Sequence, residues 1–196
     1  MSIPWRVVGP VAAVLLAGAA ALVVSQNDPA PEDSGSQPPV AVSSDAPRYE
    51  TLDELAGAAD LVVRAHVTRT EHGRLFGDPT SANAVESRLV TLAVDQTLRG
   101  DDPGAGLLLE EEGWSADGAP LIVDGASPTE RGDEAIWFLT EVEGPEGRTF
   151  ITVSSVGRYL VEGGDLVGPE SADPLAVELA ALTPEALTAR IAALAP

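Results

Sequence analysis

The segment LVVRAHVT at residues 61–68 alternates between apolar and polar side chains from Val63 onward. Val63, Ala65 and Val67 are apolar, whereas the residues between and after them are Arg, His and Thr. Because successive side chains of an extended chain point to opposite faces, this pattern predicts a β-strand with one face buried and the other in water. The segment therefore predicts that the chain folds around a β-sheet.

Segments of the same character follow along the chain. Residues 88–98 repeat the alternation, and the turn sequence GDDPG follows at residues 100–104. Shorter strands are predicted at residues 107–111, 134–141, 149–153, 158–161 and 165–167. Several short strands separated by Gly-rich turns are typical of an antiparallel barrel or sandwich.

Short helices are predicted at both ends of this strand region. Thr51 and Glu54 form the capping-box pattern T-x-x-E at the start of an apolar helix face. Near the C-terminus, Asp173-Pro174 and Thr183-Pro184 each combine an N-cap residue with a Pro at the first helical position. We expect a mainly β fold of the α+β class, with a small antiparallel barrel, a short N-terminal helix and C-terminal helices.

The order of the segments LDELAGAADLVVRAHVT, VTLAVDQTLRGDDP, GDEAIWFLT and VGRYLVEGGDLVG resembles bacterial secreted domains with an OB-like barrel of the netrin/TIMP type. In these domains a long strand ends in a hydrophobic residue, a basic residue and Gly, as in Leu98-Arg99-Gly100 here. The resemblance covers residues 49–168 and implies an OB-like barrel that serves as a binding or accessory module. Animal inhibitors of this type place an N-terminal Cys on the zinc of a protease. This chain has no Cys, so that mechanism is not implied.

The N-terminal residues predict export from the cytoplasm. Residues 7–24 are all apolar, Gly or Pro, which is close to the length of about 20 residues that spans a bilayer. Arg6 precedes them and favours a cytoplasmic N-terminus. Small residues at positions 17–21 also fit a signal-peptide cleavage site. Residues 1–25 are therefore either a transmembrane anchor or a signal peptide, and both place the rest of the chain outside the membrane.

Residues 26–48 predict a disordered linker. They hold five prolines among Ser, Asp, Glu and Gln and have little apolar content, which favours extended conformations. This division leaves residues 49–168 for the barrel and residues 169–196 for the C-terminal helices.

The charge of the chain is strongly negative. It contains 31 acidic and 11 basic residues, and its formal net charge is −20. This charge repels phosphate backbones and excludes nucleic acid as a partner, and it favours a soluble monomer. Three explanations of the acidity remain open: calcium binding, a saline habitat, or solubility alone. The absence of Cys excludes disulfides, thiolate metal sites, Cys nucleophiles and Cys-linked lipids.

The sequence carries no recognisable catalytic motif. The string nearest to G-x-S-x-G is GWSAD at residues 113–117, which lacks the final Gly. His66, on a predicted strand, and His72, in a predicted loop, have neither an H-E-x-x-H spacing nor another metal-binding spacing. We therefore expect a binding role rather than an enzyme.

Two groups of residues are candidates for ligand binding. Trp114, in a predicted loop, follows Glu110, Glu111 and Glu112, and an exposed Trp beside carboxylates is typical of a binding surface. The alternative role of Trp114 is to cap the barrel. Asp101, Asp102 and Asp117 lie in predicted turns and offer the oxygen ligands that calcium prefers.

These features together predict a function class. We expect a noncatalytic binding or accessory module, tethered to the cell membrane through residues 7–24 and exposed outside it to an unidentified ligand or protein. If the N-terminal segment is cleaved, the same module is secreted. The alternative is a small hydrolase of the cell envelope that uses two carboxylates in different environments.

Overall fold

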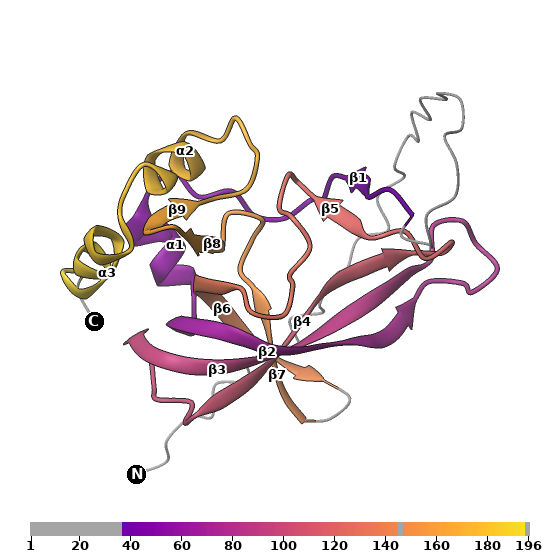
Figure 1. Cartoon of the computed structure of the whole chain (residues 1–196), viewed down its shortest axis with the longest axis horizontal. Coiled ribbons are helices and arrows are strands. Elements are labelled where there is room, and N and C mark those ends of the chain that lie inside the picture. The colour runs from indigo at the N-terminus through magenta and orange to yellow at the C-terminus, as the bar shows by residue number, and fades with distance from the viewer. Residues whose placement is uncertain (1–36, 145–146, 195–196) are drawn as a thin grey trace, which may run out of the picture.

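The computed structural model describes residues 37–144 and 147–194 (Figure 1). In chain order the elements are β1 (Val40–Val42), α1 (Leu52–Ala58), β2 (Leu61–Phe76), β3 (Val85–Arg99), β4 (Gly106–Ser115), β5 (Leu121–Val123), β6 (Glu134–Gly144), β7 (Gly147–Thr152), β8 (Arg158–Glu162), β9 (Asp165–Val167), α2 (Pro174–Ala180) and α3 (Pro184–Ala192). The prediction of a mainly β fold with a short helix before the first long strand and helices at the end is confirmed.

The predicted membrane segment at residues 7–24 lies outside the described residues. Within residues 37–144 and 147–194, no helix has the length and apolar character that a membrane span requires.

A seven-stranded sheet forms the body of the protein, with the strand order β2-β3-β4-β7-β6-β8-β9. β2 also pairs with β6, so the sheet curls back on itself into a barrel-like ring. The ring is not closed along its length. Between the described residues of β4 and β7 the pairing consists of a single parallel pair, Leu109 with Phe150. The prediction of a barrel is thus confirmed as a curled, mainly antiparallel sheet with an opening between β4 and β7.

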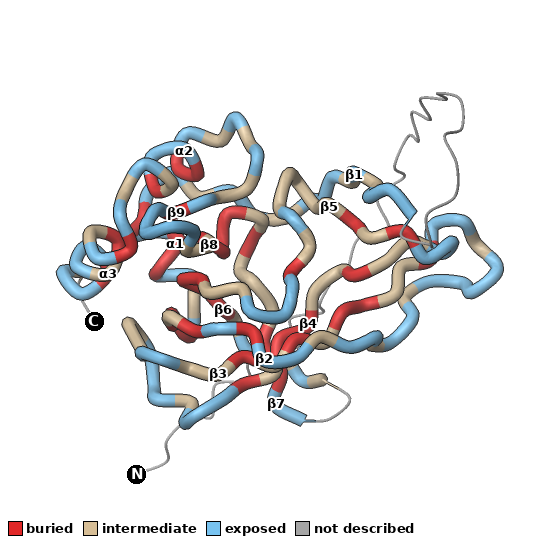
Figure 2. The backbone as a smooth tube through the Cα atoms, in the orientation of Figure 1, coloured by how far each residue is buried: buried red, intermediate tan, exposed pale blue. Residues whose placement is uncertain are grey.

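The core lies on both sides of β2 and β6. Val63 and Trp137 belong to a cluster on the inside of the ring, together with residues of β3 and β4. Val62 and Phe138 face the other way and pack with the three helices, which lie together at one end of the molecule (Figure 1). Figure 2 shows the buried residues along β2, β4 and β6 and in the three helices. At the start of residues 61–68, the side chains therefore point alternately into two different cores. One face of the strand is open to water only from Arg64 onward.

Part of the predicted linker is a strand. β1 pairs in parallel with β5, with Val40 opposite Leu121 and Val42 opposite Val123. Ser44 then donates a hydrogen bond from Oγ to Oδ2 of Asp124 at 2.5 Å. The expectation of a disordered linker is therefore wrong for residues 40–42. The residues on either side of this strand are Pro-rich and polar. The strand is ordered by hydrogen bonds to a segment about 80 residues away in the sequence.

The predicted turn after β3 is confirmed. Of its two glycines, one is tightly packed and the other is open to solvent. Gly100 and Gly104 have φ angles of 90° and 85°, a region that disfavours residues with a Cβ atom. A Cβ atom on Gly100 would lie 2.3 Å from the carbonyl oxygen of Asp60, whereas one on Gly104 would meet nothing within 4 Å.

We predict that Gly100→Ala destabilises the fold far more than Gly104→Ala. Gly104→Ala carries only the conformational penalty of positive φ, about 1 kcal/mol. Gly100→Ala adds a clash with the start of β2, and we expect a loss of about 3 kcal/mol in the free energy of unfolding. Urea denaturation of the two variants measures the difference. Equal losses would contradict the tight contact between this turn and Asp60.

Candidate functional site

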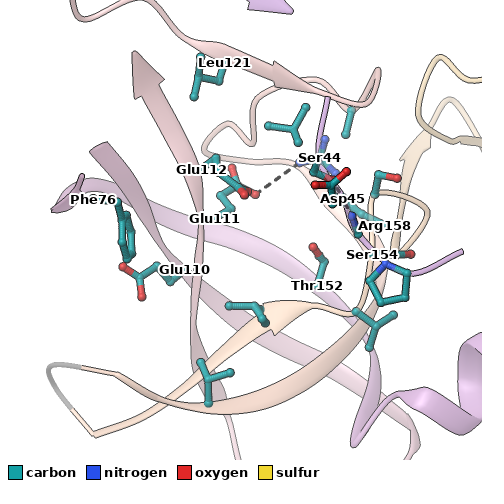
Figure 3. A pocket seen from close by; sticks show the side chains of 18 of the residues that line it. Ser44, Asp45, Phe76, Glu110, Glu111, Glu112, Leu121, Thr152, Ser154 and Arg158 are labelled. Atoms are coloured by element: carbon teal, nitrogen blue, oxygen red, sulfur yellow. Dashed lines mark hydrogen bonds and ion pairs between the residues drawn. The ribbon is translucent and has the colours of Figure 1, made fainter. Parts of the chain in front are cut away.

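A cavity of about 330 Å³ lies at the opening between β4 and the strands β6 and β7 (Figure 3). Glu110, Glu111 and Glu112 of β4 form one wall. Residues 44–47, which we call the strap, contribute to the lining, as does the chain that follows β5. The remaining lining residues come from β2, β5, β6, β7, the loop after β7, and β8: Arg74, Phe76, Leu121, Val123, Val142, Glu143, Ile151, Thr152, Val153, Ser154, Ser155 and Arg158.

Glu110 is neutralised by a close ion pair. Its carboxylate accepts hydrogen bonds from Nε and Nη2 of Arg74, both at 2.9 Å. Glu110 is only 5% exposed, so this two-pronged contact replaces the water that its carboxylate has lost. Arg74 also lies over the ring of Phe76, 4.6 Å from the ring centre, which fixes both side chains at the mouth of the cavity.

Glu111 is held in a network of buried charges. Its Oε1 accepts a hydrogen bond from Nη1 of Arg88 at 3.1 Å, and its Oε2 accepts one from Oγ1 of Thr129 at 2.8 Å. Nη1 of Arg158 lies 3.9 Å from Oε2 and donates to Thr129, while Nη2 donates to the carbonyl of Ser127. Burial lowers the pKa of Arg158, and the attraction of Glu111 opposes that shift. The carboxylate of Glu111 is therefore fully engaged by Arg88, Thr129 and Arg158.

Glu112 is in a different environment from its two neighbours. Its pKa is raised above the usual 4.5, first by loss of water on burial and then by the negative charges of Glu111 and Asp124, while a hydrogen bond from its own backbone opposes the shift. None of the ion pairs between described residues includes Glu112. Glu112 is thus a desolvated carboxylate that faces a cavity without a cationic partner.

Trp114 is separated from this cavity. It lies on β4, not in the predicted loop, and its ring stacks on that of His72 with the centres 3.9 Å apart. The guanidinium of Arg88 also lies over the Trp114 ring, 4.5 Å from the ring centre. The structure therefore brings Glu110, Glu111 and Glu112 together at the cavity but leaves Trp114 out of the residues that line it.

The two histidines make ordinary surface contacts. Nδ1 of His66 lies 3.0 Å from Asp95, and Nδ1 of His72, which is on β2 and not in the predicted loop, lies 3.0 Å from Glu86. Neither histidine is among the residues that line the cavity, so the described lining offers carboxylates but no imidazole.

The predicted calcium ligands are far apart. Asp101 and Asp102 precede β4 and Asp117 follows it, so the ten residues of β4 separate them by about 30 Å. Asp102 accepts a hydrogen bond from the backbone of Gly104, and Asp117 accepts one from Ser115, which lowers the pKa of Asp117. Within the described ranges no group of three or more His, Cys, Asp or Glu side chains is arranged to hold a metal ion. Calcium binding stays a prediction that these contacts do not support.

Several residues at the cavity were not predicted from the sequence. Arg74 and Phe76 lie beyond the predicted end of β2, Arg158 starts β8, and Ser154 lies in the loop before β8. Ser154 is 5% exposed, and its Oγ has no hydrogen-bond partner among the described residues. A lone Arg or Ser carries no local signal of a site, and only the curled sheet brings these residues to the three glutamates.

Comparison with protein-family models and with curated proteins gives no match to this chain. The lining of the cavity combines five carboxylates, of which those of Glu110 and Glu111 are paired with arginines, with an apolar wall that includes Phe76, Val142 and Ile151. Pockets that bind small molecules combine mostly apolar linings with a few polar groups that fix the orientation of the ligand.

We predict that Glu112→Gln stabilises the protein at neutral pH. A carboxyl group whose pKa is raised in the folded state favours unfolding once it ionises, so its cost is absent below the usual value of 4.5 and fully present above the raised pKa. The melting temperature of the variant should exceed that of the parent at pH 7, and the difference should disappear as the pH falls below 4.5.

Glu162→Gln is the matched control, because Glu162 is an exposed carboxylate on β8 outside the cavity. It removes the same charge from the same strongly acidic chain. An equal rise in melting temperature for both variants would show that net charge, and not the burial of Glu112, causes the effect.

Proposed function

We propose that this chain is a noncatalytic binding module, exposed outside the membrane, and that the cavity beside β4 is its ligand site. The observation that carries this proposal is the cavity of about 330 Å³ whose wall holds Glu112 half-buried and without a cationic partner. A desolvated charged group that lowers the free energy of unfolding and faces a cavity is typical of functional sites, because such groups are kept for binding and not for stability.

We also propose that the curled sheet is an OB-like barrel of the netrin/TIMP type. Two features support this assignment. β2, β3, β4, β7 and β6 follow one another around the ring, and α1 precedes β2 directly. The opening between β4 and β7 then corresponds to the incomplete closure that OB-like barrels commonly show.

A carboxylate-dependent hydrolase is the second candidate. It is favoured by one observation: Glu111 and Glu112 have opposite environments in the same cavity, as acid and base pairs often do. Binding is supported better, because Glu110 and Glu111 are occupied by arginines. In addition, Phe76 is the one aromatic side chain among the described lining residues, whereas sugar-cleaving sites need aromatic surfaces for the substrate.

The location of the module is testable by cysteine labelling, since the parent chain has no Cys. Asp101 is exposed in the turn after β3. We expect a membrane-impermeant maleimide to label Asp101→Cys in intact cells that express the full chain. Ser2→Cys should be labelled only after lysis if the N-terminal segment is retained, and should be lost from the mature protein if it is cleaved. Labelling of Asp101→Cys only after lysis would contradict an external domain.

Binding is testable with cyclohexanol, a neutral compound with an apolar body. We expect saturable binding to the full chain in lipid nanodiscs, measured by saturation-transfer NMR against empty nanodiscs. Ile151→Trp should weaken binding by about tenfold, because the larger ring fills the apolar wall of the cavity. Val177→Trp is the matched control on α2, where the side chain is 59% exposed and does not line the cavity.

The same preparation separates the two candidates. The parent chain and Glu112→Gln should both leave 4-nitrophenyl acetate and 4-nitrophenyl glycosides uncleaved above the background rate. Cleavage by the parent chain that Glu112→Gln abolishes would overturn the noncatalytic proposal and establish the hydrolase.

A further inference from the structure

The charge of the cavity wall is unbalanced. Five carboxylates line it, those of Asp45, Glu110, Glu111, Glu112 and Glu143, against the guanidinium groups of Arg74 and Arg158. The two arginines are engaged by Glu110 and Glu111. Asp45 and Glu143 are exposed to water at the rim, so the inner, desolvated negative charge is that of Glu112. A cationic group of a ligand would supply the partner that Glu112 lacks.

A second polar group in the cavity also lacks a partner. Ser154 is 5% exposed, and its Oγ makes no hydrogen bond to any described residue. Figure 3 shows Ser154 on the side of Arg158, away from Glu112, so the two groups are independent of each other. A buried hydroxyl without a partner is unfavourable, and because this Oγ atom is itself enclosed, a ligand would reach it only after the side chains around it move.

The rest of the lining selects against a bare metal ion. Calcium needs about six to eight oxygen ligands, whereas the glutamates next to Glu112 are taken up by Arg74, Arg88 and Arg158. The lining also has a large apolar share, made by Ala46, Phe76, Leu121, Val123, Val142 and Ile151. An apolar wall beside a single carboxylate suits the carbon body and charged head of an organic cation.

We propose that the cavity binds a small organic ammonium ion, with its N–H groups against the carboxylate of Glu112 and its carbon body on the apolar wall. The proposal rests on the function proposed above, that this cavity is a ligand site. The recognition chemistry is that of a charged hydrogen bond formed in surroundings with little water, which strengthens the attraction between the two charges.

Three compounds that share one ring test the proposal: cyclohexylamine, cyclohexanol and cyclohexanecarboxylate. They are cationic, neutral and anionic at pH 7, and each is titrated by NMR against the full chain in nanodiscs of zwitterionic lipid. We expect cyclohexylamine to bind about tenfold more tightly than cyclohexanol, and the carboxylate not to bind measurably. Glu112→Gln should remove the tenfold advantage of the amine and leave the affinity for cyclohexanol unchanged.

Two controls exclude a general attraction of cations to the acidic chain. Glu162→Gln removes an exposed charge outside the cavity and should leave the affinity for cyclohexylamine unchanged. Calcium chloride at millimolar concentration should not displace the amine. A melting temperature of Glu112→Gln at or above that of the parent at pH 7 shows that a loss of binding in that variant does not come from misfolding.

The outcomes are distinguishable from those of the proposed function. Equal affinities for amine and alcohol, or equal losses in Glu112→Gln and Glu162→Gln, would overturn the ammonium proposal while the binding module stands. Displacement of the amine by calcium would replace the organic cation with a metal ion. Binding of none of the three compounds would overturn the proposed function together with this inference.

Discussion

The hydrogen bonds on both edges of β2 are the constraint on which the rest of the structure depends. Over Val62 to His66 this strand pairs with β3 on one side and with β6 on the other. A strand that is paired on both edges and covered on both faces has no contact with water at its start, which explains why Leu61, Val62 and Val63 are consecutively apolar. Because β3 and β6 are also connected to each other through β4 and β7, the pairing of both with β2 bends the sheet into a ring.

The curl has a consequence at the opposite side of the ring. β4 and β7 approach each other there but share a single residue pair, Leu109 with Phe150. Beyond that pair the interior between the strands holds charged groups instead of hydrogen-bonded backbone. Arg158 of β8 approaches Glu111 here, whereas Arg88 pairs with Glu111 from the neighbouring strand β3. The ion pairs thus occupy space that a closed barrel would fill with apolar side chains, and the unfilled remainder is the cavity.

Much of the fold was predictable because its signals are local. The alternation at residues 61–68 and the N-caps at Thr51, Asp173 and Thr183 depend only on neighbouring residues, and the structure has the strand and the three helices. The far half of β2 was missed because its side chains are polar or half-exposed without a period of two. β1 was missed because its three residues are ordered only by pairing with β5.

The candidate site was predictable only in part. Three consecutive glutamates are a local signal, and Glu110, Glu111 and Glu112 do meet at the cavity. Their different roles were not predictable, since Arg74, Arg88 and Arg158 come from three other strands and decide which carboxylate is neutralised. Trp114 is not among the residues that line the cavity, because it continues the same strand and stacks on His72 of β2, and its role in binding stays a prediction.

The attachment of β1 has a mechanical consequence. β1 and β5 form a two-stranded sheet that shares no strand with the seven-stranded sheet among the described residues. The strap at residues 44–47 follows β1 directly, is fixed by the hydrogen bonds of Ser44 to Asp124, and lines the cavity. A pull on the chain from its N-terminal side is therefore borne first by the three residue pairs of β1 with β5 and by the hydrogen bonds of Gln37 to Asp117 and of Ser44 to Asp124. These yield before the larger sheet does, so tension would uncover the cavity while the barrel-like ring stays intact.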